Sequence, residues 1–251
     1  MPKLRHLYSL LFYLLSPLVL LRLLYRSLRE PDYRRAPLER LGFFQTKATG
    51  PVLWIHAVSA GEMNAAAPLV KRLLALGHNC LVTNTTPAGR ERCQSLLGNV
   101  AEGAAEGSVE NCYAPYDLPG SVKRFLRRNN PTALIIVDTE LWPNMIHCCA
   151  ERGIKTILVN GRLSAKSAAG YGRLRGLSAR MMGSLDIVAV QTDAHAERFV
   201  ALGAEASRVH VTGSIKFDGA AAMDAAAKAE ALQARLGCPC CLLLAASTHP
   251  G

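Results

Sequence analysis

The sequence predicts an α/β domain built on a doubly wound parallel sheet. From residue 51 onward, short apolar runs alternate with helix-like stretches, as in strands joined by crossover helices. The runs are almost continuously apolar, which is typical of strands buried on both faces of a sheet. Several helix-like stretches end at glycine, a common residue at helix C-termini. The predicted strands are 52–58, 79–85, 132–138, 155–160, 186–191, 208–213 and 241–247, and the predicted helices are 63–76, 88–97, 118–128, 143–152, 171–183, 193–202 and 222–236.

The first element along the chain is an apolar segment with basic residues on both sides. Residues 7–21 read LYSLLFYLLSPLVLL. This apolar segment of 15 residues is short for a membrane-spanning helix, which needs roughly 20. Pro17 should kink the helix. An arginine-rich stretch follows instead of a signal-peptide cleavage site, and this stretch should stay in the cytoplasm. We therefore expect residues 3–28 to anchor the chain, as a short span or an interfacial helix, with 1–30 as anchor and basic flank. A buried core helix is the alternative.

Composition narrows the class of partner. The net charge of +10 suggests nucleic acid, an anionic membrane or a phosphorylated substrate. The sequence lacks helix-turn-helix, zinc-finger and aromatic RNA-binding signatures, so we expect no nucleic acid. Cys238 and Cys241 have CxxC spacing, but no second pair or histidine stands at metal spacing. We therefore expect no metal and no cofactor, and buried, reduced cysteines.

Polar residues follow five of the predicted strands. Because ligands bind at the carboxyl ends of parallel strands, these residues should meet at one edge of the sheet. Carboxylates, an arginine and a lysine together at such an edge predict a functional site. The strand-end segments are 59–62, 85–89, 138–144, 160–164 and 214–218.

Glu62 stands at a strand-to-helix turn, directly after Gly61. The turn lacks GxGxxG, and a carboxylate would repel a pyrophosphate, so a dinucleotide site is excluded. Glu62 could instead accept a proton from a substrate hydroxyl, while Gly61 lets the substrate approach the backbone. The alternative is a simple helix N-terminal acid, worth up to about 1 kcal/mol.

Two further carboxylates and two cations stand at other strand ends. Asp138 or Glu140 could orient a hydroxyl or a base. Arg162 and Lys216 could hold negative charge that develops on a phosphate or a carboxylate. Either cation could equally be an ordinary solvated residue.

Seven motifs in order resemble the bacterial 3-deoxy-D-manno-octulosonic acid (Kdo) transferases of lipopolysaccharide synthesis. The motifs are HAVSAGE, TNTTPAGRERCQS, YDLPGSVKRFL, VDTELWPN, NGRLSAKSAAGY, VQTDAHAERFVALGA and VTGSIKFD. The resemblance implies a GT-B glycosyltransferase with two Rossmann-like domains facing across a cleft. It implies transfer of Kdo from CMP-Kdo to a lipid A precursor, lipid IVA, with inversion and without metal. The enzyme would act at the cytoplasmic face of the bacterial inner membrane.

The resemblance also implies roles for individual residues. Glu62 resembles the general base, and Asp138 and Lys216 occupy positions of residues thought to stabilise the transition state. By the resemblance, Ser247, Thr248 and His249 begin the donor-side segment and should bind substrate. The other expected substrate-binding residues come from the strand ends and are Ser59, Gly61, Glu140 and Arg162.

The chain departs from the family pattern in three places. Asp138 stands where the family usually has glutamate, and a displacement of about 1 Å can reduce a rate on the order of 100-fold. Segment 99–112 is longer than expected, and we predict a surface loop there. Family members carry a second domain of comparable size, and we expect this chain to lack it. We therefore expect residues 31–218 to form the acceptor domain, and 219–251 a linker helix and the first strand of a donor domain.

Two hypotheses about activity follow. In the first, the chain is the acceptor half of a transferase and is inactive alone. In the second, it is a non-enzymatic, membrane-bound module that binds anionic lipid and does not depend on Glu62.

Overall fold

The computed structural model describes residues 3–98 and 107–216. The chain separates into two compact units, residues 1–215 and 216–251. Only Lys216 of the second unit is described, so the following account concerns the first unit. The predicted helix 222–236 and strand 241–247 lie outside the described residues, as do Ser247, Thr248 and His249.

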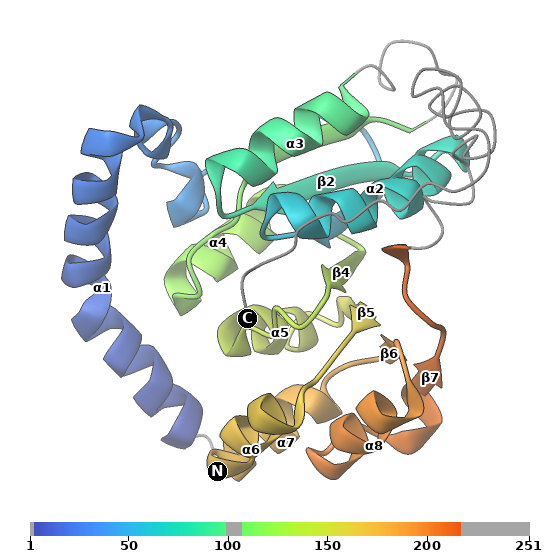
Figure 1. Cartoon of the computed structure of the whole chain (residues 1–251). Coiled ribbons are helices and arrows are strands. Elements are labelled where there is room, and N and C mark those ends of the chain that lie inside the picture. The colour runs from blue at the N-terminus through green and yellow to red at the C-terminus, as the bar shows by residue number, and fades with distance from the viewer. Residues whose placement is uncertain (1–2, 99–106, 217–251) are drawn as a thin grey trace, which may run out of the picture. The chain divides into compact units, whose positions relative to one another are not determined.

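Seven parallel strands form one sheet in the order β3-β2-β1-β4-β5-β6-β7 (Figure 1). The order runs one way from β1 to β3 and the other way from β4 to β7, so the topology reverses between β1 and β4. Such a reversal is where doubly wound sheets bind ligands. The strands are β1 (Val52–His56), β2 (Asn79–Asn84), β3 (Val109–Tyr113), β4 (Ala133–Val137), β5 (Lys155–Gly161), β6 (Ile187–Val190) and β7 (Val209–Val211).

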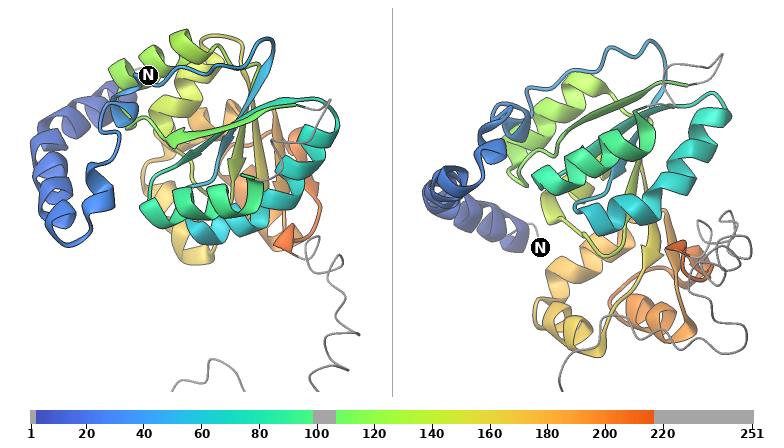
Figure 2. Two further views of the ribbon diagram at one scale, coloured as in Figure 1. Left: turned by 90° about the horizontal axis from the view of Figure 1, so that it is seen from above. Right: turned by 45° about the horizontal axis from the view of Figure 1, so that its top comes forward.

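Helices cover both faces of the sheet, which confirms the predicted fold class. On β1, Trp54 and Ile55 point to opposite faces and belong to two separate hydrophobic cores. The Trp54 ring packs against Phe125, with ring centroids 4.6 Å apart. One face is covered by α2 (Ala60–Ala75) and α3 (Pro87–Leu97), and the other by α4 (Pro119–Asn129), α5 (Pro143–Ala150), α6 (Ala165–Arg173), α7 (Arg175–Gly183) and α8 (Asp193–Ala201) (Figure 2).

Two predicted elements were wrong. Strand β3 occupies part of the segment that we predicted as a loop. Only its last two residues, Cys112 and Tyr113, are buried, so the strand lacks an apolar run. Its Glu110 carboxylate accepts the backbone N–H groups of Lys47 (2.8 Å) and Ala48 (3.2 Å). The predicted helix 171–183 is two helices, because the backbone leaves the helical region at Leu174 (φ −110°, ψ 44°).

The N-terminal helix α1 (Lys3–Arg29) is long and apolar enough to cross a membrane, by length and composition. It continues through Pro17 and bends about halfway along (Figure 1). Most of its leucines are exposed, including Leu14 (68%) and Leu28 (70%), so the alternative of a buried core helix is wrong.

Buried polar contacts join the first turns of α1 to the sheet domain. The Tyr8 hydroxyl donates to Asp117 Oδ2 (3.0 Å), and the Ser9 hydroxyl donates to Asn144 Oδ1 (3.0 Å). Asp117 also accepts the N–H groups of Asn144 (3.0 Å) and Met145 (2.7 Å) in the first turn of α5. Burial raises the pKa of Asp117 to about 7, although these hydrogen bonds oppose the shift. One carboxylate thus caps α5 and holds α1.

The described cysteines match the sequence prediction. Cys80, Cys93, Cys112, Cys148 and Cys149 are buried free thiols.

We expect Gly42→Ala to destabilise the fold by about 2–5 kcal/mol. Gly42 has a φ of +82°, and a Cβ there would overlap the Ser121 carbonyl oxygen of α4. The left-handed backbone contributes about 1–2 kcal/mol and overpacking about 1–3 kcal/mol. Gly77→Ala is the matched control, since Gly77 has a φ of +83° but open space around it. Urea unfolding of the detergent-solubilised chain measures the free energy of unfolding of both variants. Equal losses of stability in the two variants would contradict the clash at Gly42.

Candidate functional site

A cleft of about 530 Å³ lies at the carboxyl ends of β1, β4, β5 and β6, on both sides of the topological reversal. Four predicted site residues line it: Glu62, Asp138, Glu140 and Arg162. The remaining lining residues are Thr139, Ser164, Ser167, Gln191 and His195. The structure therefore gathers three carboxylates and a guanidinium from three separate strand ends.

Glu62 has a local structural role as well as a place in the cleft. Ser59 is the N-cap of α2, and its hydroxyl donates to Glu62 Oε1 (3.0 Å). The Val58 N–H donates to Glu62 Oε2 (2.7 Å), and the Glu62 N–H donates back to the Ser59 hydroxyl (3.4 Å). This arrangement is close to a capping box, so Glu62 does act as a helix N-terminal acid, whereas its role as a base stays a prediction. The cap holds the carboxylate in one position at the cleft wall.

The surroundings of Glu62 increase the proton affinity of its carboxylate. Burial raises the pKa of its carboxyl above the usual value, while the hydrogen bonds from Val58 and Ser59 oppose this. The negative charges of Glu140 and Asp138 raise the pKa further. A carboxylate with a raised pKa binds a proton more strongly, as general-base catalysis requires.

A buried amide fixes Asp138. Asp138 and Asn160 have left-handed φ values of 61° and 58°, a region that asparagine and aspartate enter more readily than most residues. The Asn160 Nδ2 donates to Asp138 Oδ1 (2.9 Å), and Asn160 Oδ1 accepts from Gln191 Nε2 (3.0 Å) and the Ile215 N–H (3.3 Å). Asn160 thus links groups at the ends of β4, β5, β6 and β7.

Arg162 and Glu140 differ in how firmly they are held. The Arg162 Nε lies 4.0 Å from Asp138 Oδ1, and its side chain is 62% exposed. Such a pair contributes little stability and leaves the guanidinium free to meet a ligand. Glu140 Oε2 accepts from Trp142 Nε1 (3.1 Å), and the edge of the Trp142 ring meets His56, with ring centroids 4.8 Å apart.

The other predicted site residues have different surroundings. The Ser59 hydroxyl is engaged with Glu62. Gly61 is exposed in the first turn of α2, and the nearest atom to an added Cβ is the Ser59 hydroxyl oxygen at 3.9 Å. Lys216 is exposed and is the first residue of the second unit. Its role stays a prediction, as do those of Ser247, Thr248 and His249.

Sequence reasoning missed three cleft residues, which are Ser167, Gln191 and His195. Gln191 directly follows β6, and His195 lies in the first turn of α8. The strand-end rule would have found both, but we counted Gln191 as the last residue of its strand. His195 Nδ1 lies 3.0 Å from the Leu163 carbonyl oxygen. Thr139 and Ser164 lie inside the predicted strand-end segments 138–144 and 160–164, although no role was predicted for them. Ser167 lies in α6, just beyond the second of these segments.

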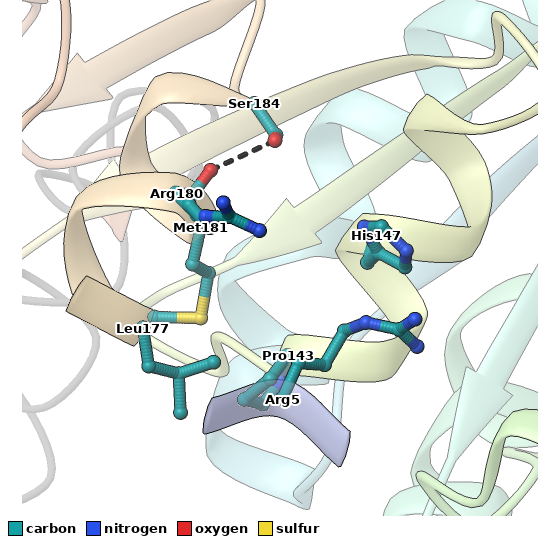
Figure 3. A pocket seen from close by; sticks show the side chains of 7 residues that line it. All are labelled: Arg5, Pro143, His147, Leu177, Arg180, Met181 and Ser184. Atoms are coloured by element: carbon teal, nitrogen blue, oxygen red, sulfur yellow. Dashed lines mark hydrogen bonds between the residues drawn. The ribbon is translucent and has the colours of Figure 1, made fainter. Parts of the chain in front are cut away.

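The cleft differs from a second cavity, shown in Figure 3. That cavity has a volume of about 30 Å³, room for only one or two waters. Arg5, Pro143 and His147 line it together with α7, where the Ser184 hydroxyl donates to the Arg180 carbonyl oxygen (2.8 Å). Across residues 3–98 and 107–216, no group of three or more His, Cys, Asp or Glu side chains could hold a metal ion.

Comparisons with a family model and with curated proteins indicate the same family. A family model described as 3-deoxy-D-manno-octulosonic-acid transferase (kdotransferase) matches residues 36–219. A 3-deoxy-D-manno-octulosonic acid transferase of Haemophilus influenzae is 34% identical over 98% of this chain and 57% of its own length. The Bordetella pertussis protein of the same name is 35% identical over 85% of this chain and 50% of its own length. The chain therefore spans about half the length of these relatives.

A solved structure supports the fold alone. UDP-GlcNAc 2-epimerase from Neisseria meningitidis, bound to UDP-GlcNAc, matches with a TM-score of 0.51 and 14% sequence identity. The match covers 74% of this chain and 53% of the epimerase.

We expect the His56→Phe variant to lose less folding stability at acid pH than the parent. His56 is fully buried at the end of β1, with Nδ1 3.0 Å from the Thr83 hydroxyl oxygen. Burial lowers its pKa to about 3, whereas the unfolded chain protonates it near pH 6.5. The unfolded state therefore binds more protons between these values, and stability falls as pH falls through that window.

The loss attributable to His56 is about 2 kcal/mol between pH 7 and pH 5. Urea unfolding at the two pH values should show that the variant loses correspondingly less stability than the parent. The exposed His78 serves as a control through His78→Gln, which should behave like the parent. An unchanged loss in His56→Phe would contradict the buried, neutral imidazole.

Proposed function

The chain belongs to the Kdo transferase family, and we propose that it is the acceptor-binding half of a glycosyltransferase. The proposed reaction transfers Kdo from CMP-Kdo to a lipid A precursor in lipopolysaccharide synthesis. The observation that carries the proposal is the position of Glu62, which lines the cleft at the topological reversal with a raised pKa.

Glu62 acts as the general base in this proposal. Its carboxylate takes the proton of an acceptor sugar hydroxyl as the hydroxyl oxygen attacks the anomeric carbon of Kdo. The bond from that carbon to the CMP phosphate breaks, and the configuration inverts because attack comes from the opposite face. Because Ser59 and Val58 hold Glu62, the base needs little reorganisation.

The neighbouring groups orient substrates and balance charge. Asp138, held by Asn160, orients the acceptor hydroxyl. The exposed guanidinium of Arg162 can meet the donor carboxylate or the leaving phosphate, and we assign Lys216 the same type of role. The left-handed backbone at residue 138 favours aspartate over the longer glutamate that the family usually carries.

The membrane position follows from α1. We place α1 at the cytoplasmic face of the bacterial inner membrane, with its exposed leucines in the lipid. Tyr8 and Ser9 are hydrogen-bonded to the sheet domain, and a spanning orientation would break those contacts. These contacts favour a helix that lies in the interface.

We expect Glu62→Gln to reduce transfer at least 100-fold, since the loss of a general base removes a factor of about 10² to 10⁴. Glutamine can keep part of the capping interaction, so the free energy of unfolding should fall by only about 1 kcal/mol or less. The assay uses membranes with radiolabelled CMP-Kdo and lipid A precursor. The chain is tested alone and with a separately supplied donor half.

The matched control is Glu197→Gln, which removes an exposed carboxylate of α8 and should leave transfer unchanged. If Glu62→Gln is as active as the parent, Glu62 is only a helix cap. If no combination transfers Kdo while the precursor still binds, the non-enzymatic lipid-binding module is the better description.

A further inference from the structure

Arg40 is a buried cation without an acidic partner in the described structure. It is 3% exposed, and only Nη1 donates a hydrogen bond, to the Thr85 carbonyl oxygen (3.0 Å). Its Nε and Nη2 are buried and find no acceptor among the described residues. The guanidinium lies 3.9 Å from the centroid of the Tyr113 ring, which compensates only part of the charge. A buried charge normally has a counterion.

The adjacent acid is already engaged. Glu39 Oε2 pairs with Arg90 Nη1 (2.9 Å) and accepts the Tyr113 N–H (2.8 Å). Two N–H groups of Arg40 therefore have neither an acceptor nor a counterion among the described residues.

Arg40 lines a groove of about 280 Å³, close to the lower end of the roughly 300–1,000 Å³ of ligand pockets. We call this the arginine groove. Helix α1 supplies Val19, Arg22, Leu23 and Arg26 to it, and the sheet domain supplies Arg40 and Trp142. Three arginines line the groove, and none of its lining residues is acidic.

The arginine groove adjoins both the cleft and the apolar surface of α1. Trp142 lines the groove, and its indole N–H donates to Glu140 of the cleft. On α1, Leu18 (61%) and Leu21 (60%) are exposed on the same helical stretch that carries Arg22. A phosphate in the groove would thus have an apolar helix beside it and the carboxylate cleft beyond Trp142.

We propose that the arginine groove binds a phosphate monoester borne on a lipid headgroup. A phosphate monoester offers three acceptor oxygens and up to two negative charges, which suit several guanidinium groups. The apolar surface of α1 next to the groove suits the chains of a lipid. This inference rests on the proposed function, because it assigns the groove to a phosphate of the lipid acceptor.

Calorimetric titration of the full chain in zwitterionic micelles tests the groove directly. The probe is dihexanoyl phosphatidic acid, with dihexanoyl phosphatidylcholine and inorganic phosphate as comparisons. The double variant Arg22→Gln/Arg26→Gln should weaken binding of the probe at least tenfold, and Arg40→Gln should do the same. The double variant changes only exposed positions, so its result does not depend on whether Arg40→Gln folds.

Arg29→Gln/Arg127→Gln is the matched control, since it removes two exposed charges outside the groove and should change affinity less than twofold. An equal loss in this control would mean diffuse charge attraction and would overturn the proposal. Binding of dihexanoyl phosphatidylcholine or inorganic phosphate with the affinity of the probe would overturn it as well.

The binding measurement is independent of the transfer assay. Glu62→Gln should bind the probe like the parent, because Glu62 does not line the groove. If the groove variants bind normally while Glu62→Gln abolishes transfer, the groove assignment fails and the proposed function stands. If the groove variants lose binding while Glu62→Gln transfers normally, the role of Glu62 fails and the phosphate site stands.

Discussion

The side-chain amide of Asn160 holds together the strand ends on which the cleft depends. Its Nδ2 donates to Asp138, and its oxygen accepts from Gln191 and from the backbone of Ile215. An amide can donate and accept at once, which a carboxylate or a lysine cannot do. Asn160 is also 2% exposed and left-handed, a combination that few side chains tolerate. Asn160 thus adopts the left-handed backbone conformation and also orients the Asp138 carboxylate at the cleft.

The parallel sheet determines where chemistry can occur in this domain. Both faces of the sheet are covered by apolar side chains of the helices, so charged side chains are disfavoured there. The carboxyl ends of the strands are left for charged residues, and the reversal between β1 and β4 separates the crossover connections there. Glu62 has two roles at this edge of the sheet. It caps the N-terminus of α2, and its carboxylate lines the cleft.

Much of the fold and part of the site could be predicted from the sequence, because both depend on local patterns. Apolar runs located six of the seven strands, whereas β3 is half-exposed and carries Glu110 at the sheet edge. The expectation that ligands bind at the carboxyl ends of strands found Glu62 and Asp138, because both stand close after an apolar run. Arg40 and Asp117 could not be found in this way. Arg40 bonds to Thr85, 45 residues away, and Asp117 bonds to Tyr8, 109 residues away, so their burial depends on where α1 and the loops pack.

Asp117 and Arg40, the two buried ionisable side chains that sequence patterns did not reveal, differ in how many hydrogen-bond partners surround them. Asp117 has three donors around it, from α1 and α5, so its burial is structurally compensated. Arg40 has one acceptor and an aromatic ring, and the acid beside it in the sequence is paired elsewhere. A fold selected only for stability would pair Arg40 or replace it with an apolar residue. Departures of this kind are expected where a protein meets its ligand. Among residues 3–98 and 107–216 Arg40 has no acidic partner, and it lies on the side of the domain next to α1, from which the proposed phosphorylated lipid would approach Glu62.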